Sequence, residues 1–307
     1  MEGIGGLDGW RGMNAKREER EWTASVNGTG LRVEEIGSGA ETVVFSPALF
    51  ANRGMFDAPV AALSDDFRCI RYDHRGQGDS GLGAFQPSRH RLGTEGLYDD
   101  AVALLDQLHL DSCHWVGASI GGFVGMRLAA RHPDRVRSLV LIGPNVRPLP
   151  RADLRQIDLF GLMLRASHRL GRVGAAVRRR TTEQVMRNML GATFMSDPSR
   201  ADIRETWRQR YSAQLVPEAV PMIREVFGYP ENRREMLARI QAPTLILVGD
   251  NDAHGVAAPD EGARETQEAI SGARLVTIHG AGHIVLVEEP SAATAEIAKF
   301  IRAAKAV

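Results

Sequence analysis

The stretch Val116-Gly117-Ala118-Ser119-Ile120-Gly121-Gly122 constrains the fold of this chain more than any other part of its sequence. It places one serine between an apolar run and a helix-like run, with glycine two residues before it and two residues after it. A strand that turns so abruptly into a helix forces its central residue into a cramped conformation, and side chains at both glycine positions would collide with neighbouring backbone. The turn would present the hydroxyl of Ser119 and the N–H group of Ile120 to one space at a helix N-terminus. An ordinary glycine-rich turn with no catalytic role could have the same residues, so other parts of the sequence are needed to distinguish the two alternatives.

The length and composition favour one large globular domain with an inserted subdomain, because the chain has 307 residues. The formal net charge of +0 gives no indication of a nucleic-acid partner. No apolar run reaches the roughly 20 residues that span a bilayer, so we expect no membrane partner. The N-terminal segment lacks the apolar core of a signal peptide. Cys69 lies in a predicted strand, and Cys113 lies just before another. We expect both to be reduced thiols in or near the core. We therefore expect a cytoplasmic protein.

Strand-like and helix-like segments alternate along most of the chain, which predicts an α/β fold with a doubly wound, mostly parallel sheet. Several of the later strands are continuous apolar runs, as expected for strands that are covered on both faces. The predicted strands span residues 31–36, 42–46, 68–72, 114–118, 138–142, 244–248 and 274–278. The predicted helices between them span residues 94–108, 120–131, 261–270 and 291–304.

The alternation stops between residues 147 and 239, where only helical patterns occur. These predicted helices span residues 153–170, 182–190, 199–214 and 217–227. We interpret residues 147–239 as a helical cap inserted into a core that consists of residues 21–146 and 240–307. Residues 1–20 contain several glycines and a run of charges, so we expect a flexible N-terminal extension there.

A serine hydroxyl is a weak nucleophile, which needs a neighbouring base and a third group that orients the base. Two candidates follow strands downstream of the insertion: an acidic loop at residues 249–252 and Gly-Ala-Gly-His at residues 280–283. The carboxyl ends of parallel strands lie along one edge of a sheet, where ligands bind. Ser119, an aspartate of the acidic loop and His283 would therefore converge, and their order along the chain is that of α/β-hydrolases.

These motifs make the chain similar to the α/β-hydrolase superfamily from about residue 21 onward. The stretch Asp73-His74-Arg75-Gly76-Gln77-Gly78-Asp79-Ser80 resembles the loop that this family carries after its fourth strand. The resemblance implies a sheet of about eight strands and a helical cap over the active site. It also implies a Ser-His-Asp triad of Ser119, His283 and Asp252, with Asp250 as the second choice for the acid. It implies no metal and no organic cofactor.

The loop after the third predicted strand departs from the family pattern. The family commonly has His-Gly there, whereas this chain has Pro47-Ala48. By alignment, Leu49 would supply the second N–H group of the oxyanion hole beside that of Ile120. Enol-lactonases also lack His-Gly at this place, and residues 45–57 and 71–80 resemble them most. These two donors would stabilise the alkoxide that forms when Ser119 attacks a carbonyl group.

The predicted cap is strongly basic, with 18 arginines and no lysine against 10 acidic residues, a formal charge of +8 over residues 147–239. An arginine of the cap could bind a substrate carboxylate with both arms of its guanidinium group. The alternative is that the arginines cover the solvated outer faces of the cap helices. The candidates are Arg165, Arg169, Arg172, Arg204, Arg208 and Arg210.

The leading hypothesis from the sequence is a serine hydrolase that cleaves a small-molecule carboxylic ester or lactone through an acyl-serine intermediate. Hydrolysis of a carbon–carbon bond and cofactor-free perhydrolysis use the same triad and stay open. A ligand-binding receptor on a hydrolase scaffold is the alternative of a different class, and the missing His-Gly pair is the feature that supports it. Pairing of cap helices in a homo-oligomer also stays open.

Overall fold

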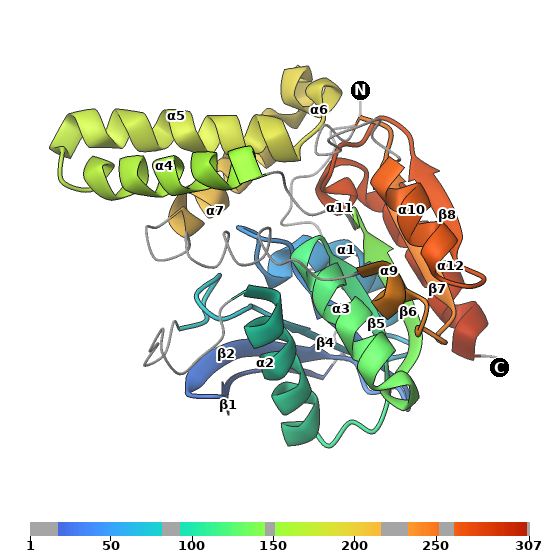
Figure 1. Ribbon diagram of the computed structural model, residues 1–307. Coiled ribbons are helices and arrows are strands. Elements are labelled where there is room, and N and C mark those ends of the chain that lie inside the picture. Colours follow the sequence, from blue (N-terminus) through green and yellow to red (C-terminus); the bar gives the residue numbers. More distant parts are fainter. Residues whose placement is uncertain (1–17, 82–92, 145–150, 216–232, 252–260, 306–307) are drawn as a thin grey trace.

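The computed structural model describes residues 18–81, 93–144, 151–215, 233–251 and 261–305. Eight strands form one sheet in the order β1-β2-β4-β3-β5-β6-β7-β8 (Figure 1). The two pairings at the β1 end are antiparallel and the other five are parallel, so the predicted mostly parallel sheet is confirmed. The strands are β1 (Glu19–Val26), β2 (Thr29–Ile36), β3 (Thr42–Ser46), β4 (Arg68–Tyr72), β5 (Cys113–Ala118), β6 (Val136–Ile142), β7 (Thr244–Gly249) and β8 (Arg274–Ile278).

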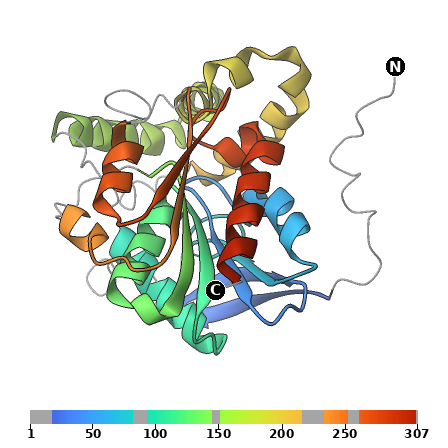
Figure 2. The same cartoon turned by 90° about the vertical axis from the view of Figure 1, so that its right-hand side faces the viewer.

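Helices cover both faces of the sheet, which leaves the central strands in the core (Figure 2). All residues of β3, β5 and β7 are buried, as the continuous apolar runs of these strands predict. One layer consists of α2 (Gly93–Gln107), α3 (Ile120–Arg131), α9 (Arg233–Leu237) and α10 (Glu261–Ala269). The other layer contains α1 (Asp57–Leu63), α11 (Val285–Glu288) and α12 (Pro290–Lys305).

Strand β1 was not predicted, because the sequence analysis assigned its first residues to the flexible extension. The residues of β1 alternate between the two faces of an edge strand, with Ala24 and Val26 buried and their neighbours turned outward. The charges of Glu19, Arg20 and Glu21 lie at this edge, where β1 pairs with β2 over its whole length. A charged edge strand and a disordered charge run therefore have similar sequences.

Five of the described α-helices lie between β6 and β7, where the sequence predicted a helical insertion: α4 (Arg151–Ser167), α5 (Gly171–Met189), α6 (Ala192–Ser196), α7 (Ala201–Gln214) and α9. The hairpin of α4 and α5 projects beyond the sheet (Figure 1). Helix α5 begins at Gly171, eleven residues earlier than the predicted helix 182–190. The predicted helix 217–227 lies outside the described residues, and the boundaries of the cap stay a prediction. Among the described helices, none has the length and apolar character that a membrane span requires.

A buried ion pair fixes the loop after β4 to helix α2. Arg75 and Asp100 are 4% and 1% exposed, and Nε of Arg75 donates to Oδ2 of Asp100 at 2.5 Å. The second arm of the guanidinium group bonds to the other carboxylate oxygen, which also accepts from the amide of Asn27 at 3.0 Å. Bidentate geometry with a further donor is the arrangement that compensates best for the loss of hydration. The loop that contains Arg75 is therefore held rigidly beside the sheet.

Replacing Asp100 with alanine should lower the free energy of unfolding by about 3–5 kcal/mol, because it leaves the Arg75 guanidinium buried without a counter-charge. The matched control is Asp106→Ala on the same helix, which removes an exposed carboxylate that pairs with Arg135. That change should cost less than about 1 kcal/mol. Urea unfolding of the three proteins checks the difference, and equal losses in both variants would contradict a structural role for the buried pair.

Candidate active site

The turn between β5 and α3 has the cramped geometry that its glycines predict. Ser119 has φ 48° and ψ −110°, a conformation that residues other than glycine rarely adopt. A Cβ atom on Gly117 would lie 2.3 Å from the carbonyl oxygen of Gly121, and one on Gly121 would lie 2.0 Å from that of Ser46. Both glycines are therefore required by close approach of backbone. The amide of Ser119 donates to the carbonyl of Ile142 at 2.8 Å, which anchors the turn to the end of β6.

His283 lies at the same end of β6 as Ser119. Its side chain is 7% exposed. A Cβ atom on Gly143, the residue after Ile142, would lie 2.9 Å from Cε1 and 3.0 Å from Nδ1 of the His283 ring. Consecutive residues of the chain thus contact the backbone of Ser119 and the ring of His283. Two side chains that are 164 positions apart in the sequence are brought to one edge of the sheet, as the strand-end argument predicts.

The acidic loop after β7 is only partly described. Asp252, the predicted acid, lies outside the described residues. The carboxylate of Asp250 accepts from Nδ1 of His279 at 3.0 Å and from the N–H of Gly280 at 2.8 Å, so it holds the turn that follows β8. The amide of Asn251 donates to the carbonyl of Ala281 at 2.9 Å. The acidic loop and the loop of His283 are therefore bonded together, and Asp250 already has a structural role in that contact.

The loop after β3 has one backbone amide, that of Leu49, between two amides with acceptors. The N–H of Ala48 donates to Sδ of Met55 at 3.4 Å, and the N–H of Phe50 donates to Oε1 of Gln77 at 2.8 Å. Between them, the N–H of Leu49 has no acceptor among the described residues. Ile120 is the first residue of α3, and the first N–H groups of a helix have no partner within the helix. Gly121 contacts the end of β3 at Ser46, so α3 begins close to this loop.

Residues of the loop after β4 support the loop after β3, a role that the sequence analysis did not predict. His74 is 1% exposed, and its Nε2 lies 3.1 Å from the carbonyl oxygen of Pro47 and 3.3 Å from Oγ of Ser46. Burial lowers the pKa of His74 to about 4 and outweighs the bond to Pro47, which acts to raise it. The ring is therefore neutral near pH 7, and its Nε2–H donates a hydrogen bond to the carbonyl of Pro47.

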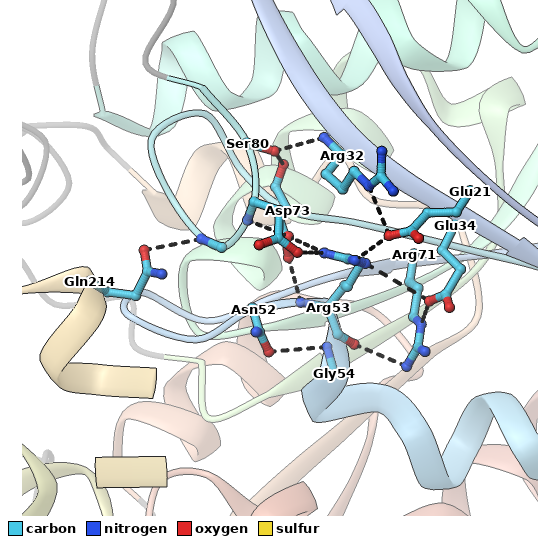
Figure 3. Close-up of polar contacts among 12 residues, drawn as sticks. Glu21, Arg32, Glu34, Asn52, Arg53, Gly54, Arg71, Asp73, Ser80 and Gln214 are labelled. Atoms are coloured by element: carbon cyan, nitrogen blue, oxygen red, sulfur yellow. Dashed lines mark hydrogen bonds and ion pairs between the residues drawn. The ribbon is translucent and has the colours of Figure 1, made fainter. Parts of the chain in front are cut away.

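A network of charges surrounds Arg53, which follows the loop after β3 (Figure 3). The amide of Arg53 donates to Asp73 at 2.6 Å, and its guanidinium group donates to Asp73 at 2.5 Å and to Asp79 at 2.8 Å. The same group pairs with Glu21 on β1. Burial acts to lower the pKa of Arg53, but the bonds and charges of Asp79 and Asp73 outweigh it and raise this pKa. The network ties the loops after β3 and β4 to the edge of the sheet.

The segment between β6 and β7 contacts both the loop after β4 and the loop that contains His283. Gln214 at the end of α7 accepts from the amide of Gly78 at 3.0 Å (Figure 3). Glu288 is fully buried and accepts from the amides of Gly191, at 2.7 Å, and Gly282, at 2.9 Å. The amide of His283 itself donates to the last residue of α5, Met189, at 3.2 Å. Glu288 therefore joins the helical insertion to the loop that contains His283.

The six candidate arginines of the insertion differ in their surroundings. Arg165, Arg169 and Arg172 are exposed. Arg204 donates to the carbonyls of Phe194 and Asp197, and Arg208 pairs with Glu205. Arg210 stacks on the ring of Trp207 at 4.7 Å, and its guanidinium group lies against Gly54 in the loop after β3. Burial lowers the pKa of Arg210. That one of the six binds a substrate carboxylate stays a prediction.

Within the described ranges, no cluster of three His, Cys, Asp or Glu residues could hold a metal ion.

The sequence profile of the family described as alpha/beta hydrolase fold matches residues 41–290. The chain therefore belongs to the α/β-hydrolase family. Rhodomycin D methylesterase DauP of Streptomyces sp. strain C5 is 31% identical over 246 residues, 73% of this chain and 78% of that protein. A protein named carbamate hydrolase RutD, from Caulobacter sp. strain K31, is 41% identical over 114 residues, 37% of this chain. The chain spans 41% of the length of that relative.

Among solved structures, the enol-lactonase from Burkholderia xenovorans LB400 is similar to this chain with a TM-score of 0.73 and 26% sequence identity. The similarity covers 91% of this chain and 99% of the enol-lactonase. The predicted resemblance to enol-lactonases and esterases is thereby confirmed.

Replacing Gly121 with alanine should lower the free energy of unfolding by at least about 3 kcal/mol, because the new methyl group would overlap the carbonyl of Ser46. Gly122 is the matched control, since the nearest atom to its Cβ position is 3.3 Å away. Gly122→Ala should change stability by no more than about 1 kcal/mol, because alanine is the better helix former. Chemical unfolding measures both, and a stable Gly121→Ala protein would contradict the close approach of α3 to β3.

Proposed function

We propose that this protein is a serine hydrolase that cleaves a small-molecule carboxylic ester or lactone. The observation that supports this most is the joint placement of Ser119 and His283 against Ile142 and Gly143 at the end of β6. The strained backbone of Ser119 directs a nucleophile away from the sheet, and the neighbouring histidine supplies a base. The relatives named methylesterase and enol-lactonase act on an ester and on a lactone, which is a cyclic ester.

In the proposed reaction, His283 takes the proton from Oγ of Ser119 while this oxygen attacks the carbonyl carbon. The carbonyl electrons move to oxygen, and the N–H groups of Leu49 and Ile120 bind the resulting oxyanion. When the carbonyl re-forms, the bond to the leaving oxygen breaks, and that oxygen takes the proton from His283. A water molecule then repeats the sequence on the acyl-serine and releases the acid. Asp252 keeps the imidazole in the required tautomer, and no cofactor takes part.

Replacing Ser119 with alanine should abolish turnover of p-nitrophenyl butyrate, with a loss of kcat of at least about 10³-fold. The matched control, Ser112→Ala, changes a serine that lies before β5 and bonds to Arg137 at 3.0 Å. It should leave kcat unchanged. Unaltered activity of the Ser119 variant would remove the proposed mechanism. Stoichiometric labelling of Ser119 by a fluorophosphonate without multiple turnover of any ester would favour a receptor instead.

The two aspartates of the acidic loop should differ in the same assay. Asp252→Asn should lower kcat by about 10³- to 10⁴-fold, because the imidazole then loses the partner that selects its tautomer. Asp250→Asn keeps an oxygen that accepts from Gly280, and we expect it to retain at least a third of the wild-type kcat. A larger loss for the Asp250 variant than for the Asp252 variant would contradict the assignment of the acid.

A further inference from the structure

The peptide group between Leu49 and Phe50 is held by a single buried side chain. Oε1 of Gln77 accepts the N–H of Phe50 at 2.8 Å, and the glutamine is 1% exposed. Phe50 has φ 62°, in the left-handed region that costs a residue with a Cβ atom free energy. A bond to the amide of Phe50 therefore stabilises a conformation that this residue would otherwise leave. The N–H of Leu49 belongs to the preceding peptide group, which is joined to this one through the φ and ψ angles of Leu49, so fixing one peptide group restricts the other.

We infer that Gln77 is a positioning residue of the oxyanion hole, which it serves by fixing the peptide group that follows Leu49. This inference rests on the proposed function, in which the N–H of Leu49 binds an oxyanion. The amide of Leu49 lies between two peptide groups that are both fixed, one by Met55 and one by Gln77. An oxyanion hole depends on donors that are oriented before the reaction begins. Gln77 would contribute to catalysis without touching the substrate.

The surroundings of Gln77 argue against a role in packing alone. Its amide nitrogen is buried and has no hydrogen-bond partner among the described residues. The bond to Phe50 is therefore the one polar contact of this side chain in the described part of the chain. An apolar residue would avoid this unpaired nitrogen but would leave the N–H of Phe50 without its acceptor, and either unpaired donor is costly in a protein interior. The cost of the unpaired amide nitrogen is explained if the oxygen of Gln77 is required as the acceptor for the N–H of Phe50.

The backbone of Gln77 is also fixed, so the side chain acts from a rigid base. Its amide donates to the carbonyl of His74 and its carbonyl accepts from Ser80, both at 2.9 Å. The neighbouring Arg75 is held by the buried pair with Asp100. His74 binds the carbonyl of Pro47 at 3.1 Å, on the other side of Leu49. Two side chains of residues 73–80 thus bond to the loop after β3, one on each side of Leu49, the proposed donor.

The test compares Gln77→Leu, which has a similar size and no acceptor, with Gln77→Glu, which keeps an acceptor. With p-nitrophenyl butyrate, we expect Gln77→Leu to lower kcat by about 10- to 100-fold and to leave KM within twofold. Inhibition by butylboronic acid, whose adduct with Ser119 is tetrahedral, should weaken by a similar factor. Burial favours the neutral, protonated form of the new carboxyl group, which keeps an accepting oxygen, so Gln77→Glu should restore kcat to within about threefold of the wild type. If the leucine variant does not fold, Gln77→Asn replaces it, because its shorter side chain withdraws the acceptor.

Gln214→Leu is the matched control, since it removes another glutamine oxygen, the one that accepts from Gly78. Its kcat should stay within twofold of the wild type. The inference is overturned if Gln77→Leu keeps more than half of the wild-type kcat, if leucine and glutamate reduce it equally, or if the loss falls on KM alone. Activity that survives Ser119→Ala would instead overturn the proposed function. A Ser119 variant without activity beside a fully active Gln77→Leu would overturn only the positioning role.

Discussion

The close contact between the start of α3 and the end of β3 is the constraint on which the rest of the candidate site depends. Gly121 lies so near the carbonyl of Ser46 that no side chain fits between the two backbones. This contact brings the first N–H group of α3 and the loop that follows Ser46 into one region. The strain at Ser119, of order 1–3 kcal/mol for a residue in a rare backbone conformation, is tolerated because the strand and helix on both sides are fully paired. The same turn therefore brings Ser119, the proposed nucleophile, and the start of α3 to the end of β3, before the loop that contains Leu49.

Long-range polar contacts then add precision that the sheet alone does not supply. Gln77 bonds to the loop after β3, and Glu288 joins the loop of His283 to the segment after α5. The helical insertion thus contacts the site from two directions, at Gly78 through Gln214 and at Gly282 through Glu288. Of these two contacts, only the one at Gly282 reaches a loop with a proposed catalytic residue, the base His283, whereas Gly78 lies in the loop after β4.

Most of the core could be predicted from the sequence, because buried parallel strands are apolar runs and their helices have a clear period. The predicted helix 120–131 and strand 42–46 agree with the structure at both ends. Strand β1 could not be recognised, since its first three residues, Glu19, Arg20 and Glu21, are charged and exposed. The roles of Gln77 and Glu288 could not be predicted either, because their partners lie 27 and 97 positions away and leave no spacing in the sequence. Local patterns indicate elements, whereas contacts between loops appear only in the folded chain.

The distribution of charge around the oxyanion loop follows from the same arrangement. The side chains that bond to residues 47–50 of this loop are neutral: the amide of Gln77, the thioether of Met55 and the imidazole of His74, whose pKa burial lowers to about 4. The ion pairs of Arg75 and Arg53 hold the loop of residues 73–80 and the edge of the sheet instead. A formal charge beside the donors would add a large fixed potential in a medium of low dielectric constant. With neutral supports, the field at a developing oxyanion is set mainly by the backbone amides and the helix N-terminus that face it.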